Sequence, residues 1–313
     1  MKLHTLETLA LTSSNVTGST YDEWVDDNST GYSIGDNVKV SFLADGVTAK
    51  FPVLEYTSLA DTNLDNYPAD NPADWIELGA ENRCKMFDDY TNTQTVNSDD
   101  IEIVISANGV ASVGIFGIYG TSVNLKLIRN AVTIKEETID LRSIVPVSGW
   151  YSWLYNKYEY GITQIIWEFP RYITGATLEI TISKIISTAK CGLVVVGNAV
   201  ELGASQYGVK IGIDDYSIKD TDSLGRTYLS QGSYAKRADV SMDINNANID
   251  FVTQKLTAVR GIPAMFDLNN DETAYQDYYT HQALALYGYP QNFDITIPGP
   301  VKSKCNLEVK GLI

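Results

Sequence analysis

The chain has 313 residues, of which 44% are hydrophobic and 20% charged, a composition typical of folded proteins rather than disordered ones. Its net charge is −16, and residues 1–100 hold 18 acidic residues against 5 basic ones, which argues against electrostatic binding of nucleic-acid phosphates or an anionic membrane. The acidic surface either keeps the protein soluble or contacts a basic partner, and the length predicts two or three domains.

The three cysteines, Cys84, Cys191 and Cys305, lie far apart in the sequence and form no C-x-x-C pair. This spacing predicts reduced thiols and favours neither a disulfide framework nor a zinc site. The sequence lacks a run of about 20 apolar residues, the length of a membrane-spanning helix. The residues after Met1 also lack the basic and apolar segments of a secretory signal. We therefore expect synthesis in the cytoplasm and no membrane insertion.

The first 90 residues contain much polar, loop-forming sequence. Residues 13–36 and 60–74 are rich in Asp, Asn, Ser, Thr and Gly, and they flank strand-like pieces such as Val38–Phe42. A further polar stretch at residues 88–95 precedes a sharp rise in β-branched residues, which marks a boundary. We predict a small, loop-rich N-terminal β module with its linker over residues 1–90.

Residues 91–190 are predicted to form a β-sandwich. In Val123–Arg129 apolar and polar residues alternate, as expected for a strand with one buried face. Such runs recur at a spacing of about eight to twelve residues, which is common in sandwiches. The aromatic cluster from Trp150 to Tyr160 interrupts them and is expected to cap one end. The expected strands are Ile101–Ser106, Val113–Tyr119, Val123–Arg129, Ala131–Asp140, Gln164–Phe169 and Thr177–Ser187.

Residues 191–313 are predicted to form a β-rich α+β domain with one helix near residues 249–260. Asn248 is the expected cap residue, and Gly261 and Pro263 mark the expected end of the helix. Between them four apolar residues recur at helical spacing: Phe251, Val252, Leu256 and Val259. The expected strands are Cys191–Val196, Val209–Tyr216, Tyr228–Ser233, Ala238–Ile244, Ala264–Leu268, Ala283–Tyr289 and Cys305–Gly311. The fold class is therefore mainly β: a small N-terminal β module, a β-sandwich and a C-terminal β-rich domain.

Residues able to support catalysis are few. His4 and His281 are the only histidines, and no nucleophile, phosphate-loop, dinucleotide or zinc-protease motif occurs. Residues 267–272 alternate oxygen ligands like the start of a calcium loop but lack its glycine and distal glutamate. Adjacent acids are expected to be solvated turns, because neighbours in an extended segment point in opposite directions; they are Asp26-Asp27, Asp88-Asp89, Asp99-Asp100 and Asp214-Asp215. We therefore expect a protein without catalytic residues, metal or cofactor.

Aromatic residues of the first module carry a resemblance. The segment Tyr32–Val38 reads Y-x-x-G-D-x-V, and it is followed by an aromatic strand and a proline-to-tryptophan segment. This pattern resembles small chitin-binding-type carbohydrate modules, although the gap between Val38 and Tyr56 is longer than in compact ones. Aromatic faces can stack on sugar rings. The resemblance implies that four rings contact a glycan: Trp24, Tyr32, Tyr56 and Trp75.

The following segment, Trp75–Asp88, reads W-x-x-x-G-x-x-N-R-x-x-M-F-D. It resembles a segment of tail and baseplate-associated proteins of tailed bacteriophages, where it joins such a module to β-sandwiches. The resemblance extends through residues 211–217, 258–263 and 305–312. We interpret the segment as a packed linker in which Arg83 pairs with an acid such as Asp88. Its structural residues are expected to be Gly79, Asn82, Arg83, Met86, Phe87 and Asp88.

The resemblance implies a structural protein of a phage tail, at the tail tip, the baseplate or the fibre attachment. Such a protein would be made in the host cytoplasm, reside in the virion and contact other tail proteins, with several copies in a symmetric assembly. Two alternatives stay open: a virion protein that recognises a host surface glycan, and a tail-associated enzyme that cleaves glycans with unidentified carboxylates. Candidate interface residues, with core burial as the alternative for each, are Trp150, Tyr151, Trp153, Tyr155, Tyr275, Tyr278 and Tyr279.

Overall fold

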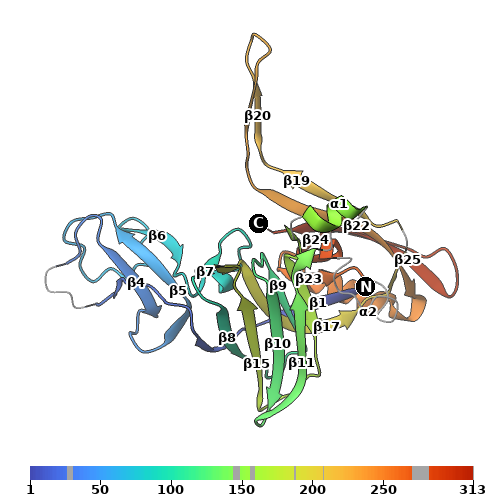
Figure 1. Cartoon of the computed structure of the whole chain (residues 1–313), viewed down its shortest axis with the longest axis horizontal. Coiled ribbons are helices and arrows are strands. Elements are labelled where there is room, and N and C mark those ends of the chain that lie inside the picture. The colour runs from blue at the N-terminus through green and yellow to red at the C-terminus, as the bar shows by residue number, and fades with distance from the viewer. Residues whose placement is uncertain are drawn as a thin grey trace.

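The computed structural model describes residues 1–26, 31–143, 149–155, 159–186, 188–206, 208–269 and 282–312. Strands hold 54% of the chain and helices 8%, which confirms the predicted mainly-β class. Figure 1 shows a small module at one end, a body built around two sheets, and a long hairpin that projects from the body.

The N-terminal module contains a four-stranded sheet in the order β3-β4-β5-β6. The four strands are Asp22–Glu23, Asn37–Phe42, Ala49–Ser58 and Trp75–Ala80. A cluster of its own, with Val38, Val40, Tyr56, Tyr67 and Trp75 buried, forms the module's core. The module therefore has a hydrophobic core separate from the cores of the body.

One layer of the body is a five-stranded antiparallel sheet in the order β11-β10-β15-β8-β2. Its strands are Val132–Asp140, Ser122–Arg129, Ala176–Ser183, Ile101–Ser106 and Leu11–Ser14. In β10 buried and half-buried residues alternate, so Val123, Leu125 and Leu127 face the core as the sequence pattern predicted. They pack with Val113, Ile165 and Val194 of the second sheet in one core, which gives a sandwich-like arrangement.

The second layer is a ten-stranded sheet in the order β14-β9-β17-β1-β23-β24-β25-β22-β18, with β19 also paired to β22. β1, Lys2–Glu7, lies between β17 and β23 and is antiparallel to both. It therefore joins the two halves of this sheet. The remaining strands are Gln164–Glu168 (β14), Ser112–Phe116 (β9), Leu193–Glu201 (β17), Ala264–Asp267 (β23), Ala285–Thr296 (β24), Lys302–Gly311 (β25), Tyr234–Asn245 (β22), Ala204–Ser205 (β18) and Lys210–Asp215 (β19).

This pairing crosses both of the domain boundaries predicted from the sequence. β1 was assigned to the module of residues 1–90, yet it pairs within the body. β9 and β14 come from the predicted sandwich of residues 91–190, and they share the sheet with strands of residues 191–313. The physical reason is that the backbone groups on both edges of a buried strand need partners, wherever in the sequence those partners lie.

The predicted helix is present as α2, Ile249–Ala258. Val252 and Leu256 are buried in the core beneath it, whereas Phe251 is 43% exposed and lies outside the apolar face to which it was assigned. The cap also differs from the prediction. Asn248 makes no capping bond; instead Asn245 accepts a 3.1 Å bond from the amide of Ala247 and caps the short 3₁₀ turn η2, Asn246–Asn248.

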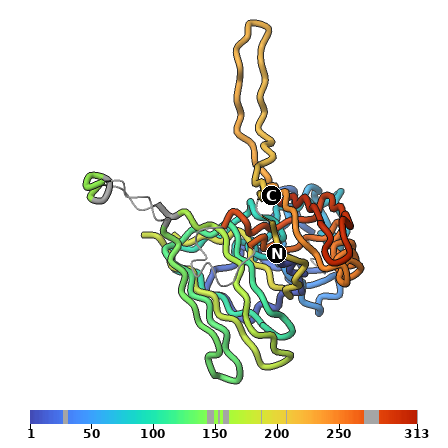
Figure 2. Tube along the Cα trace, turned by 90° about the vertical axis from the view of Figure 1, so that its right-hand side faces the viewer, coloured from blue at the N-terminus to red at the C-terminus, as the bar shows by residue number. Residues whose placement is uncertain are grey.

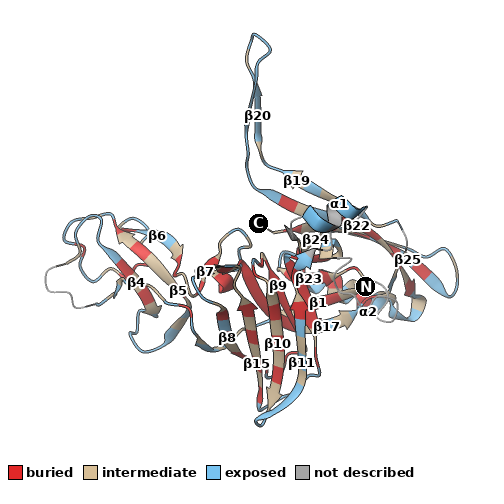
Figure 3. Cartoon of the chain, viewed as in Figure 1, coloured by how far each residue is buried: buried red, intermediate tan, exposed pale blue. Residues whose placement is uncertain are grey.

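The smaller elements connect or extend the sheets. β7, Thr95–Asn97, pairs with β16, Ala189–Cys191, and β12, Arg142–Ser143, pairs with β13, Glu159–Tyr160. β20, Ile218–Thr221, pairs with β21, Thr227–Ser230. The helical turns are η1, Lys85–Phe87, α1, Trp150–Tyr155, and η3, Gln282–Leu284. In Figure 3 the buried residues gather on the two sheets of the body, and every residue of the strands β20 and β21 is exposed.

Candidate functional site

The aromatic residues predicted to bind a sugar form the core of the N-terminal module. Trp75 is 2% exposed and Tyr56 3%. The Trp75 indole donates a 2.9 Å hydrogen bond to the carbonyl of Asn66, and its ring meets Tyr32 edge-on at 5.2 Å between centroids. Neither buried ring offers a face to a sugar, so the prediction that Tyr56 and Trp75 contact a glycan is wrong. A module this small needs its largest rings to form a core.

Trp24 and Tyr32 are half-buried at the edge of the same cluster. Trp24 packs edge-on against Tyr67 at 5.3 Å, and the Tyr32 hydroxyl accepts a 2.9 Å bond from the amide of Val25. Both side chains therefore have a structural contact and a solvent-facing part. Glycan contact by these two rings stays a prediction.

The segment after the module attaches it to the body. The Asn82 side chain donates to the carbonyl of Val96 at 2.9 Å and accepts from the Val96 amide at 3.0 Å, so it pairs with this backbone as another strand would. Gly79 has a φ of +107° and lies beside the β-bulge at Glu55, a conformation that favours glycine. Met86 and Phe87 are buried in the core shared by the two sheets. These positions fit the predicted packed linker.

A buried carboxylate, not the predicted Asp88, is the partner of Arg83. Glu81 is 2% exposed, and its Oε1 lies 2.7 Å from Arg83 Nη2. Its Oε2 accepts a 2.8 Å bond from the amide of Ser19. Asp88 instead accepts bonds from the amide of Tyr90 and the hydroxyl of Thr93. Glu81 thus connects the entry and the exit of the module. No local sequence pattern predicts this contact, because Ser19 lies 62 residues before Glu81.

The interface candidates in the Trp150 cluster are exposed. Trp150 is 81% exposed, Tyr151 77% and Tyr155 64%, with the two tyrosine rings 4.7 Å apart between centroids. They lie on α1, which stands apart from the sheets in Figure 2. Core burial is therefore wrong for these three residues. The Trp153 side chain and three further candidates, Tyr275, Tyr278 and Tyr279, lie outside the described residues, as does His281.

The most prominent surface feature is one that the sequence did not predict as a unit. Strands near residues 209–216 and 228–233 were expected, but the structure extends β19 and β22 through β20 and β21 into one projecting hairpin (Figure 1). We call residues 216–233 the arm. Every residue of β20 and β21 is exposed, and large apolar side chains lie along the arm and at its tip: Ile218, Leu224, Tyr228 and Leu229.

The root of the arm is braced by charged and polar contacts. Asp214 lies 3.1 Å from Lys310 Nζ and 3.6 Å from Arg237 Nη1, and hydrogen bonding to Tyr216 and to Asp214 raises the pKa of Lys310. Asp215 pairs with Lys219 at 2.7 Å, which lowers the pKa of Asp215. The Asp214 contacts join the end of β19 to β22 and β25 at the base of the arm.

The tip of the arm is also ordered by its own bonds. Asp222 Oδ1 accepts bonds from the amides of Leu224, at 2.9 Å, and Arg226, at 2.8 Å, while the Asp222 amide donates to the carbonyl of Arg226. Gly225 completes this turn with a φ of +81°. Leu224 is 78% exposed at the apex. The arm therefore ends in an apolar side chain held on a defined turn.

His4 and Ser112 form a buried polar pair within the large sheet. His4 is fully buried, with Nδ1 2.9 Å from the hydroxyl of Ser112 and Nε2 3.5 Å from Glu168, and burial lowers its pKa. Ser112 is also fully buried and donates to the carbonyl of Gly197, so no substrate reaches this pair. Within the described ranges, no three His, Cys, Asp or Glu side chains gather to hold a metal ion.

Members of three of the acidic pairs have local partners. Asp99 pairs with Lys184, and Asp100 accepts a 2.9 Å bond from the Lys184 amide. Asp88 and Asp214 have the partners given above, and Asp27 lies outside the described residues. Asp89 has no cation partner in the described part of the chain, and desolvation raises its pKa.

Comparison with known proteins gives no relative. No family model matches the sequence, and neither a curated protein nor a solved structure matches it. Among the helices of the described residues, none is long and apolar enough to cross a membrane.

Proposed function

We propose that the chain is a structural component of a bacteriophage tail, at the tail tip, the baseplate or the fibre attachment, and that it acts through protein–protein contacts. The observation that carries the proposal is the arm, because it projects from the body with its apolar side chains uncovered. The tail itself is suggested by the resemblance of the Trp75–Asp88 segment.

A two-stranded hairpin is at best marginally stable alone in water, because it buries little surface. Single exposed apolar residues are normal on a protein. The arm differs because both of its faces carry exposed apolar residues. Lys219 pairs with Leu229, and Asp220 pairs with Tyr228. Because side chains alternate along a strand, Ile218 and Tyr228 share one face and Leu229 lies on the other. A ribbon that is apolar on both faces suits a groove or a space between neighbours better than a flat surface.

The second exposed surface supports the same interpretation. Trp150, Tyr151 and Tyr155 expose most of their area on α1, and aromatic residues of this kind are enriched in the centres of protein interfaces. Large tail assemblies repeat one contact many times, so modest interfaces are sufficient when copies are arranged symmetrically. No catalytic residue is needed for this role.

The test is to locate the chain in phage particles. Antibodies against the purified chain, marked with gold, should label one end of the tail on intact particles released by the strain that carries the gene. Antibodies first absorbed with the purified chain serve as the control. Particles that bear no label, and in which mass spectrometry finds no peptide of the chain, would overturn the proposal.

Glycan recognition is a weaker second candidate, supported by the partly exposed rings of Trp24 and Tyr32. It expects saturable binding to a host glycan on an array, with loss of binding in Trp24→Ala. A matched change at an exposed aromatic residue outside the module, Tyr119→Ala, should leave that binding intact. If the chain binds no glycan, or if both variants bind equally, this candidate fails.

A further inference from the structure

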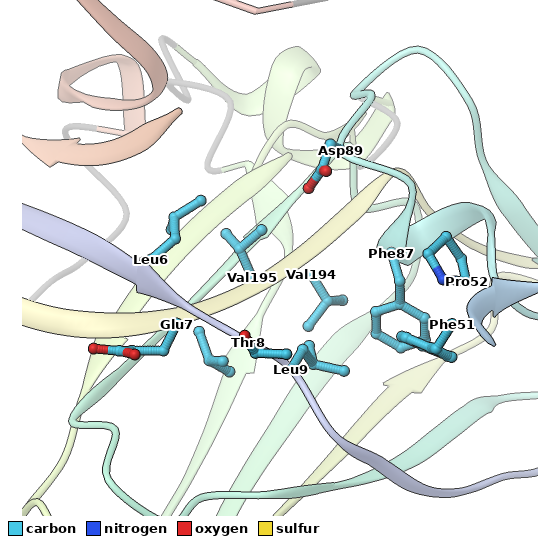
Figure 4. A pocket seen from close by; sticks show the side chains of 11 residues that line it. Leu6, Glu7, Thr8, Leu9, Phe51, Pro52, Phe87, Asp89, Val194 and Val195 are labelled. Atoms are coloured by element: carbon cyan, nitrogen blue, oxygen red, sulfur yellow. The ribbon is translucent and has the colours of Figure 1, made fainter. Parts of the chain in front are cut away.

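A cavity of about 230 Å³ lies where the N-terminal module meets the body (Figure 4). Its lining is mainly apolar and comes from the end of β1, from the start of β5, from η1 and from β17; it includes Leu9, Phe51, Phe87, Val194 and Val196. Cavities for drug-sized ligands are typically about 300–1,000 Å³. The smaller volume here suits a single apolar side chain.

Two carboxylates complete the lining of this cavity. Glu7 and Asp89 are exposed acids at different edges of a lining that is otherwise apolar apart from Thr8, and the Glu7 side chain extends away from Asp89 (Figure 4). Glu7 accepts a 3.1 Å bond from Asn198, and neither acid forms an ion pair with a described residue. Partial desolvation raises the pKa of Asp89, which is the expected effect on a carboxylate without a nearby cation. The cavity therefore suits an apolar group that has a positive charge beside it.

The tip of the arm has this combination of groups. Leu224 is 78% exposed at the apex, and Arg226 follows two residues later with an exposed side chain. The hydrogen bonds of Arg226 at the turn are made by its backbone amide and carbonyl. Within the described residues, its side chain forms no ion pair. Both residues belong to the turn that the Asp222 hydrogen bonds define.

We propose that the arm tip of one copy of the chain docks into this cavity of a second copy, with Leu224 in the apolar part and Arg226 against Asp89. The arm points away from β1 and β5, which carry the cavity (Figure 1), so the contact joins two copies. Since the tip and the cavity are different surfaces, the contact is head-to-tail, and each copy gives one arm and receives another. Such contacts build closed rings or open filaments.

This inference rests on the proposed function, because it names the chain itself as one partner of the arm. The first test is sedimentation velocity of the full chain up to about 100 µM, a concentration at which a complex with a micromolar dissociation constant is populated. We expect association beyond the monomer that Leu224→Asp and Arg226→Glu weaken about tenfold or more. Two matched controls, Ile173→Asp at an 83% exposed isoleucine and Arg260→Glu at an exposed arginine, should associate as the unchanged chain does.

A charge exchange tests the pairing itself. Asp89→Lys alone should weaken association, and Asp89→Lys combined with Arg226→Glu should restore part of it. A second test uses Leu224→Cys together with Thr8→Cys, which lies in the cavity lining and is exposed. Mild oxidation should link two copies. The three native thiols are buried and give little background, and Leu224→Cys with Ile173→Cys is the control.

Several outcomes would overturn the inference. They are a chain that stays monomeric, association that Leu224→Asp leaves unchanged, or disulfides that form equally with Ile173→Cys. Circular dichroism of each variant confirms that it is folded. Gold labelling of particles is independent of these results. If the tail is labelled but the purified chain is monomeric, only the self-docking is rejected. If the particles are not labelled, the tail role is rejected.

Discussion

At the scale of single residues, Glu81 has the clearest structural role. It is a buried carboxylate that accepts bonds from the Ser19 amide and from Arg83, with the Cys84 thiol 3.5 Å away. The Gly18 position approaches it so closely that an added Cβ would lie 2.8 Å from Oε2. The carboxylate is therefore enclosed on several sides by the chain it holds together.

We predict that Glu81→Gln lowers the free energy of unfolding by about 1–3 kcal/mol, because the charge-assisted bonds weaken and one amide group is left poorly paired. Urea unfolding followed by tryptophan fluorescence measures the change. Glu102→Gln, at an exposed position of β8, should change stability by less than about 0.5 kcal/mol. Equal effects in the two variants would contradict the role assigned to Glu81.

The buried imidazole of His4 predicts a pH dependence. Desolvation lowers its pKa from the ordinary 6.5, and this outweighs the opposing effects of Glu168 and Asp267, while Lys2 lowers the pKa further. The unfolded chain therefore takes up a proton below pH 6.5 that the folded chain resists, and stability should fall by up to about 1.4 kcal/mol for each pH unit below that value. The loss ends once the pH passes below the folded pKa.

Urea midpoints at pH values from about 7.5 down to 5.5 measure this loss, and His4→Gln should show a smaller one because glutamine does not titrate. Other groups contribute equally in both proteins, so the difference between the two curves isolates His4. Parallel curves would show that His4 is not responsible.

At the scale of elements, the arm and the sheets have different energetic roles. The residues of β20 and β21 bury no face, whereas Ala238, Val240, Met242 and Ile244 of β22 are buried in the core below. Tyr216 and Ser233 are joined by a 3.1 Å backbone bond at the root. The arm can therefore be removed at this pair without uncovering the core.

We predict that replacing residues 217–232 by Asn-Gly, which favours a tight hairpin turn, leaves the free energy of unfolding within about 0.5 kcal/mol and abolishes self-association. Thermal unfolding and sedimentation velocity measure the two effects on one protein. A large loss of stability would mean that the arm packs on its own body.

The sequence predicted elements well where one face is buried. The run Ile101–Ser106 matches β8, and Val123–Arg129 lies within β10, because alternation reports a half-buried strand directly. The β20 strand has no buried face, so its residues show no alternation to detect. The turn from Asp222 to Gly225 was the one available signal for the hairpin.

The aromatic cluster marks another limit of sequence. Tyrosine and tryptophan suit cores, interfaces and sugar platforms alike, so a motif of rings does not say which face is buried. Burial of Tyr56 and Trp75 depends on Val38, Val40 and Tyr67, which pack beside them only in the folded module. For the same reason, the sequence does not show whether Trp150 and Tyr151 are buried in a core or exposed at an interface.

At the scale of the whole molecule, β1 holds the large sheet together. Its residues pair with Val196–Glu201 on one side and with Ala264–Asp267 on the other. No local pattern predicts such distant partners. Without β1, the halves β14-β9-β17 and β23-β24-β25-β22 would share no strand pairing in the described part of the chain.

We predict that Leu3→Ala, at a fully buried position of β1, costs about 2–5 kcal/mol. Hydrogen exchange should become faster in both β17 and β23, while the module strands β4 and β5, with their separate core, keep their protection. Leu59→Ala, at a 46% exposed leucine, is the control. Faster exchange confined to one side of β1 would argue against its joining role.

The position of β1 also bears on how the protein is made. The strand leaves the ribosome early, but its second partner is complete only when Asp267 has been added, on the order of 10–50 s later at typical rates of bacterial synthesis. During that interval the nascent chain carries a strand with an open edge, a known route to aggregation. Protection of the growing polypeptide by a chaperone would therefore matter more for this protein than for one whose neighbouring strands pair in order.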